Sequence, residues 1–166
     1  MSNIPPPRRV LFDTNIYGLL IERRESETVV KGYESRKFIF YGFDLVREEL
    51  RNISAEKRQG KSSLRRLVLE FYDGIVRQHH CPQTPAIERI ANEYLQEYHG
   101  GISKQSLRSD FQIVACASIH GLDLVVSADN HTMLSKLARR AYEIVNQKNH
   151  LKTPSFHSLE EFQKLL

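Results

Sequence analysis

Three aspartates stand where an apolar stretch of the sequence begins or ends, and their carboxylates are candidates for chemistry. Asp13 closes the apolar run 10–12, and Asp129 follows the apolar stretch "LDLVVS". Asp110 opens the apolar segment "DFQIVACASIH". Because burying an ionised carboxylate without a partner costs several kcal/mol, acids at such positions need a compensating group.

Glu49 is a fourth candidate, because helical spacing places it on an apolar face. We expect a helix from Asp44, as its N-cap, through Arg51. The apolar stripe of this helix consists of Leu45, Val46, Leu50 and Ile53. Glu49 lies three or four residues from three members of the stripe and points with it, whereas Glu48 lies about 100° further round the helix. An acid on the inward face needs a partner, and a divalent cation shared with the three aspartates would provide one.

Short apolar segments that alternate with helical patterns must position these acids. The predicted strands are 8–13, 37–43, 122–127 and "YEIVN" at 142–146. The predicted helices are 15–24, 44–51, 64–78, 86–98, 109–120, 131–140 and a short terminal helix. Ser109 with Gln112, and Ser158 with Glu161, have the capping-box spacing that starts a helix. Gly121 is expected to end the apolar helix as its C-cap.

This alternation predicts an α/β fold, with a central parallel sheet flanked by helices on both faces. We expect a single domain over 1–166, with a proline-rich N-terminal tail at 1–7 and a mostly helical insertion at 54–106. In open α/β sheets, ligands bind at the carboxyl ends of the strands. The four acids are therefore expected to meet at one edge of the sheet.

Each acid also has a purely structural explanation, which the sequence leaves open. Asp13 could be the N-cap of the following helix, and Asp110 could serve only the helix dipole. Asp129 could be a turn residue, and Glu49 could pair with Arg24 or another base. If the four do act together, ligands made only of oxygen favour Mg²⁺ or Mn²⁺ over zinc.

Over essentially its whole length the sequence resembles the PIN-domain ribonucleases. The motifs that carry the resemblance are "LFDTNIYG", "VREELRNI" and "SDFQIVACASIHGLDLVVSADNHTM". The resemblance implies a PIN-like domain whose catalytic, metal-binding acids are Asp13, Glu49, Asp110 and Asp129, with Asn15 and Ser127 as polar supports. Asn130 and Thr132 replace the phenylalanine-containing ending that is common in the family.

The activity that the resemblance implies is metal-dependent hydrolysis of RNA phosphodiester bonds by an endoribonuclease. Similar small proteins include VapC-type toxins, which pair with an antitoxin protein and are usually homodimers, and nucleases that process RNA alone. The alternative is a catalytically silent PIN-fold module that binds RNA or protein. A phosphatase of the haloacid dehalogenase type is disfavoured, because Asn15 stands where that chemistry requires a second aspartate.

The overall charge fits a polyanionic substrate. The chain has a formal net charge of +4 and a pI of about 9.1, and its basic residues come in clusters. Among these clusters, Arg65 and Arg66 are the predicted RNA contacts. The sequence has no signal peptide or membrane-spanning stretch and only two cysteines, which favours the cytoplasm.

Three other sets of residues are expected to have no role in chemistry. The stretch 79–81, "HHC", invites a metal hypothesis, but adjacent side chains point in different directions, so a solvated loop is predicted. Cys116 is expected in the core. Aromatic residues near the strands are expected to pack rather than to stack on bases; they are Tyr17, Tyr33, Tyr41 and Phe43.

Overall fold

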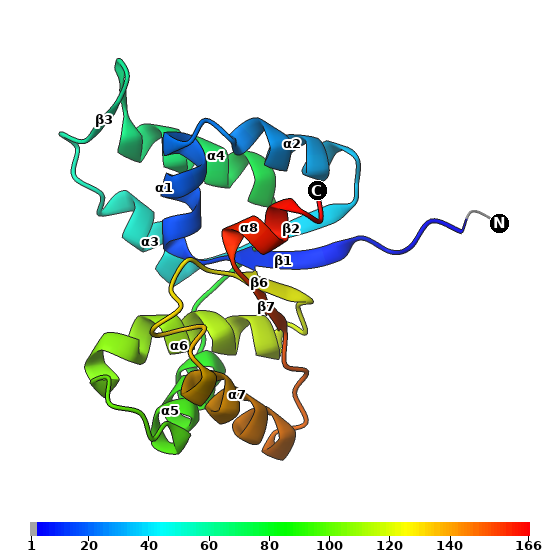
Figure 1. The fold of residues 1–166 in the computed structure, drawn as a ribbon, viewed down its shortest axis with the longest axis vertical. Coiled ribbons are helices and arrows are strands. Elements are labelled where there is room, and N and C mark those ends of the chain that lie inside the picture. The colour runs from blue at the N-terminus through cyan, green and yellow to red at the C-terminus, as the bar shows by residue number, and fades with distance from the viewer. Residues whose placement is uncertain (1–2) are drawn as a thin grey trace.

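The computed structural model describes residues 3–166, and its centre is a five-stranded sheet in the order β5-β2-β1-β6-β7 (Figure 1). The strands are β1 (Arg8–Phe12), β2 (Phe38–Phe43), β5 (His80–Cys81), β6 (Leu124–Val126) and β7 (Ser155–His157). Every neighbouring pair in this sheet is parallel. A short antiparallel hairpin, β3 (Arg58–Gln59) with β4 (Ser62–Ser63), lies outside it.

Helices cover both faces of the sheet. They are α1 (Thr14–Glu22), α2 (Ser26–Glu34), α3 (Asp44–Arg51), α4 (Leu64–Val76), α5 (Pro85–Glu97), α6 (Lys104–Ile119), α7 (Lys136–Lys148) and α8 (Leu159–Gln163). Helices α1–α4 and α8 form one layer, and α5–α7 form the other (Figure 1). The predicted α/β architecture is confirmed.

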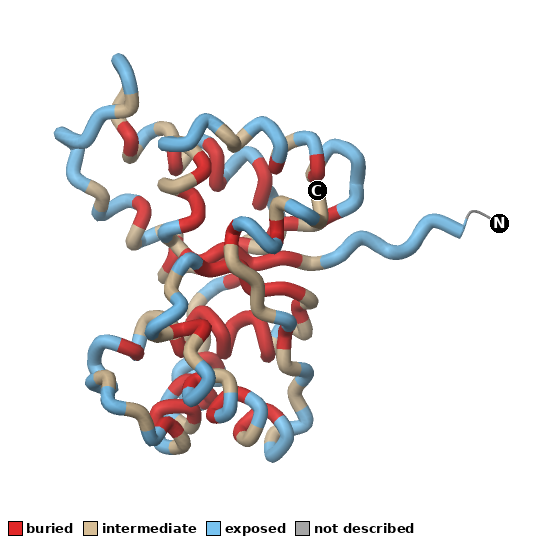
Figure 2. The backbone as a smooth tube through the Cα atoms, in the orientation of Figure 1, coloured by how far each residue is buried: buried red, intermediate tan, exposed pale blue. Residues whose placement is uncertain are grey.

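The central strand β1 is apolar because it is covered on both sides. Val10, Leu11 and Phe12 are fully buried, as expected for a parallel strand between two helical layers. The Phe12 ring lies 5.2 Å from Phe40 of β2 and 5.3 Å from Phe162 of α8. The buried residues follow the strands and the inward sides of both layers (Figure 2).

The order of the strands creates a switch point between β1 and β6. The chain moves outward from β1 through β2 to β5, returns to place β6 beside β1, and ends with β7. The connections on the two sides of the β1–β6 pair therefore run in opposite directions. In parallel α/β sheets this switch point leaves a crevice at the carboxyl ends of the two strands, where ligands bind.

Helix α6 begins earlier than predicted. Its N-cap is Ser103, whose hydroxyl accepts a hydrogen bond from the Ser106 N–H at 3.2 Å. The predicted N-cap, Ser109, is inside the helix, because the exposed polar residues before it form its first turns. Asp110 is thus at the end of the second turn, where the helix dipole has little effect.

The predicted strand "YEIVN" is wrong, because it belongs to α7. Ala138, Tyr142 and Val145 are buried at helical spacing, and this packing overrides the β preference of the sequence. Helix α7 starts at Lys136, capped by Ser135, so the predicted helix 131–140 begins instead with turn residues. The last strand is β7, which the sequence did not indicate.

The stretch 79–81 is not a solvated loop. His80 and Cys81 form β5, which pairs with Gly42 and Phe43, and Cys81 is buried. The carboxylate of Asp44 accepts a hydrogen bond from the Gln83 N–H at 2.8 Å and contacts His80 Nε2, so it does not cap α3 as predicted. The segment 54–106 thus supplies a strand of the sheet as well as helices.

Several local predictions are confirmed. Gly121 follows α6 with a φ of 61°, in the left-handed region that favours glycine, and Ser158 caps α8 by accepting a hydrogen bond from the Glu161 N–H at 3.1 Å. Tyr17, Phe43 and Cys116 are buried in the core.

The N-terminal tail and the helices bear on two further predictions. Residues 3–7 of the proline-rich tail are exposed and outside regular structure, and the first two residues lie outside the described part. Among residues 3–166, no helix has the length and apolar character needed to cross a membrane.

Candidate metal centre at the sheet edge

Asp13 is the most buried acid of the chain's described part and lies at the switch point. It follows β1 and is only 4% exposed. One carboxylate oxygen accepts a hydrogen bond from the Thr14 N–H at 2.7 Å, and the other accepts one from Ser127 Oγ at 2.8 Å. Asp13 is therefore the N-cap of α1, and Ser127, which follows β6, ties the two central strands together at this point.

Thr132 connects the acids from α6 and from the loop after β6. Its hydroxyl donates to Asp110 Oδ2 at 2.6 Å, and its N–H donates to Asp129 Oδ1 at 2.9 Å. The same Asp129 oxygen accepts a hydrogen bond from the His131 N–H at 3.1 Å. Asp129 is therefore a turn residue, and its turn holds Thr132 against Asp110.

Glu49 reaches the same region from α3. It lines a groove of about 530 Å³ together with Thr14, Asn15 and Ala128. Glu49 Oε1 and Thr14 Oγ1 are both buried, and neither makes a hydrogen bond of standard geometry among residues 3–166, although the Thr14 hydroxyl partly offsets the rise in the pKa of Glu49. An acid with a buried, unpartnered oxygen is not explained by packing alone.

The two adjacent glutamates of α3 face different surroundings, as the helical spacing predicts. Glu48 is exposed and lines a separate pocket of about 590 Å³, together with Arg47 and Arg51. Glu49 is partly buried and faces the groove beside Asn15.

The acids share one electrostatic environment. Burial raises the pKa of Asp13 and of Asp110 to about 6 each, and it also raises the pKa of Glu49. Repulsion adds to each rise: Asp13 is affected by Glu49 and Asp129, Asp110 by Asp13 and Asp129, and Glu49 by Asp110. Hydrogen bonds from Ser127 to Asp13 and from Thr132 to Asp110 offset only part of the rise in the pKa of these two aspartates. The site thus holds more negative charge than its protein surroundings balance.

The donor set fits a hard divalent cation. The four candidate ligands offer only carboxylate oxygens, which Mg²⁺ and Mn²⁺ prefer. In the described part of the chain, no three of these acids have ligand oxygens that all lie within 4.8 Å of one another.

The basic residues near the groove are not the predicted ones. Arg66 donates to Glu70 and to Ser62, each at 3.2 Å, and neither it nor Arg65 lines the groove. Lys57 does line it. Clustering in the sequence cannot distinguish these bases, because only the fold shows which of them face the groove. Thr14 was also missed, although its place next to Asp13 in "FDTN" was a usable signal.

Comparison of the chain with family models, with curated protein sequences and with solved structures finds no significant match. The chemistry of this site therefore has to be inferred from its own residues.

Proposed function

We propose that the chain is an Mg²⁺- or Mn²⁺-dependent endoribonuclease. The observation that carries the proposal is the electrostatic coupling of acids from four separate parts of the fold near the β1–β6 switch point. These acids are Asp13, Glu49, Asp110 and Asp129, and three of them have a raised pKa. Holding these negative charges close together lowers the free energy of unfolding, and a bound cation would offset that loss.

The chain's own residues would hold and orient the reaction centre. Bound Mg²⁺ or Mn²⁺ would activate water and neutralise charge on the scissile phosphate. Ser127 fixes one oxygen of Asp13, and Thr132 fixes one oxygen of Asp110, so each carboxylate keeps a defined orientation. No covalent nucleophile from the protein is required for this chemistry.

The groove and the charge of the chain support a polyanionic substrate. Lys57 lines the same groove as Glu49, and the formal net charge of the chain is +4. The resemblance to PIN-domain ribonucleases favours RNA among polyanions. It also favours a homodimer and, if the chain acts as a toxin, an antitoxin partner.

A module that binds RNA or protein without cutting is the second candidate. The separation of the carboxylate oxygens in the described residues favours it, because a site that a cation cannot close would bind substrate without hydrolysing it. Cleavage and binding must therefore be measured together.

The deciding experiment incubates the purified protein with mixed structured RNAs in Mn²⁺, in Mg²⁺ and in excess EDTA. We expect cleavage with a divalent cation, its loss in EDTA and its return when Mn²⁺ is added in excess. Cleavage that continues undiminished in EDTA would contradict the metal-dependent proposal. RNA binding without cleavage under every condition would favour the silent module.

A second test compares two basic residues. Lys57→Ala should weaken RNA binding and lower the slope of log affinity against log salt by about 0.7–0.9, the value for one lost phosphate contact. Arg66→Ala is the matched control, because Arg66 is already engaged by Glu70 and Ser62. Filter binding over a series of salt concentrations measures both slopes. Equal slopes for wild type and Lys57→Ala would remove Lys57 from the RNA contact.

A further inference from the structure

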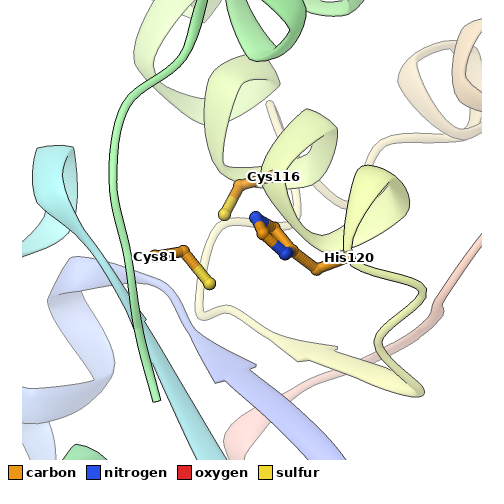
Figure 3. Close-up of side chains that lie close together, drawn as sticks. All are labelled: Cys81, Cys116 and His120. Carbon is orange, nitrogen blue, oxygen red and sulfur yellow. The ribbon is translucent and has the colours of Figure 1, made fainter. Parts of the chain in front are cut away.

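Two thiols and an imidazole meet at the opposite end of α6 from its N-cap (Figure 3). Cys81 comes from the edge strand β5, and Cys116 and His120 come from α6. The ligand atoms of these three side chains all lie within 4.8 Å of one another. Among residues 3–166 they form the one group of histidine, cysteine or acidic side chains with this spacing.

We propose that Cys81, Cys116 and His120 form a Zn²⁺ site. Two sulfur ligands and one nitrogen ligand match the preference of Zn²⁺, and they differ in kind from the carboxylates at the sheet edge. The inference does not depend on the proposed ribonuclease activity.

The dimensions of the cluster suit a tetrahedral ion. Zn–S distances of about 2.3 Å and Zn–N distances of about 2.0–2.1 Å place tetrahedral ligand atoms roughly 3.4–3.8 Å apart. Since the atoms already lie within 4.8 Å of one another, an approach of about 1.4 Å or less between any two of them would complete the geometry. Such a movement is within reach of side-chain rotation.

The backbone holds the three ligands in place. Cys116 lies in the last turn of α6 and His120 is the C-cap of that helix, whose N–H donates to the Cys116 carbonyl at 3.1 Å, so the two residues lie one turn apart. Gly121 ends the helix directly after His120 by adopting a φ of 61°. Cys81 is fixed by the pairing of Phe43 with β5.

The cluster also has an access route and a structural use. Cys81 and Cys116 are buried, whereas the side chain of His120 is still partly in contact with water. An ion can therefore enter on the His120 side and keep a water molecule as its fourth ligand. Strand β5 has two residues and one neighbouring strand. A bound Zn²⁺ would join this short edge strand to α6, so metal binding should stabilise the fold.

Titration of the reduced full-length protein with Co²⁺, followed by Zn²⁺, tests the proposal. We expect thiolate-to-Co²⁺ charge-transfer absorption and the strong visible bands of tetrahedral Co²⁺, at one ion per chain, and their loss when Zn²⁺ displaces Co²⁺. Cys81→Ser, Cys116→Ser and His120→Ala should each weaken binding more than about tenfold, since even losing a residue that only supports a ligand costs that much.

Controls separate this site from the carboxylates and from a general histidine effect. His99→Ala removes an exposed histidine, and Asp13→Asn alters the carboxylate site; both should leave the Co²⁺ spectrum unchanged. If Cys116→Ser fails to fold, His120→Ala at the end of α6 still decides the question. Zn²⁺ should raise the Tm of wild type and not that of His120→Ala.

Three results would each overturn the proposal. The first is the absence of a charge-transfer band in reduced wild type. The second is an unchanged band in both cysteine variants. The third is an equal Zn²⁺-induced rise in Tm for wild type and His120→Ala.

Discussion

Glu49→Gln should lower the rate of RNA cleavage in Mn²⁺ by roughly 10²–10³, whereas Glu48→Gln should leave it nearly unchanged. Glu49 faces the groove beside Thr14 and has a buried oxygen with no partner in the described part of the chain. Replacing it removes a negative charge that a cation at the sheet edge would use. Glu48 is exposed on another side of α3, where losing its charge affects neither the groove nor the core.

The two variants should also differ in stability. Burial raises the pKa of Glu49, with further contributions from Asp110 and Glu48, so its charge opposes folding when no metal is bound. Glu49→Gln should therefore be at least as stable as wild type in EDTA, and it should gain less Tm from Mn²⁺.

Cleavage rates in Mn²⁺ and melting temperatures in EDTA and in Mn²⁺ distinguish the possible outcomes. Loss of activity in Glu48→Gln, with activity kept in Glu49→Gln, would remove Glu49 from the site. A large fall in the Tm of Glu49→Gln in EDTA would show that its carboxylate supports the fold, and the loss of activity would then say nothing about metal binding.

The part of this structure that was predictable from sequence is the part with long, periodic apolar runs. β1 ends in three consecutive buried residues, the buried residues of β2 alternate with partly buried ones until its last two, and α3 has an apolar stripe that fixes the direction of Glu49. Because both strands are parallel and followed by helices, the position of Asp13 at a sheet edge followed from the same pattern.

The elements that were missed are short or depend on distant contacts. Strands β5 and β7 have two and three residues, too few to show a periodicity. "YEIVN" has the composition of a strand, and only its packing in the α5–α7 layer makes it helical.

Side chains that meet across the fold were equally hidden. The spacing of Cys116 and His120 was visible as one helical turn, but Cys81 joins them from a strand 35 residues earlier than Cys116. That Lys57 lines the groove, and that Arg65 and Arg66 do not, could likewise be seen only from the fold. The sequence therefore indicated single positions such as Asp13, which follows β1, and gave no sign of groups that only the fold brings together.

Asp13→Asn should make the metal-free protein more stable at neutral pH, and it should flatten the dependence of stability on pH. Burial raises the pKa of Asp13 to about 6 from the ordinary value of 3.8. Between these values the folded chain holds a proton that the unfolded chain has lost, so the free energy of unfolding falls as pH rises through this window. At about 1.4 kcal/mol per pKa unit, the loss for this residue is at most about 3 kcal/mol.

Asparagine can keep both hydrogen bonds that Asp13 makes. Its carbonyl oxygen can accept from the Thr14 N–H, and its amide can donate to Ser127 Oγ. The charge is then removed and the direction of the Ser127 hydrogen bond is reversed, while the N-cap of α1 remains, since asparagine is as good a cap as aspartate.

Denaturant unfolding in EDTA from pH 4.5 to 7.5 measures this effect, and Asp123→Asn is the control of opposite sign. Burial alone would raise the pKa of Asp123, but hydrogen bonds and charges from Lys152 and Arg9 outweigh it and hold the pKa below its usual range. The charge of Asp123 therefore favours folding, and Asp123→Asn should destabilise the protein at neutral pH while Asp13→Asn stabilises it.

Adding Mn²⁺ should reverse the ranking of wild type and Asp13→Asn. A cation at the sheet edge stabilises the ionised form of Asp13, so the charge that weakens the metal-free fold becomes a source of binding energy. Wild type should then gain Tm in Mn²⁺ at pH 7.5, while Asp13→Asn gains little and loses cleavage activity. If Asp13→Asn instead lowers stability in EDTA at pH 7.5, the carboxylate is already balanced by Ser127 and the backbone. Asp13 would then serve only to cap α1 and to link β1 to β6 through Ser127, and it would not be a metal ligand.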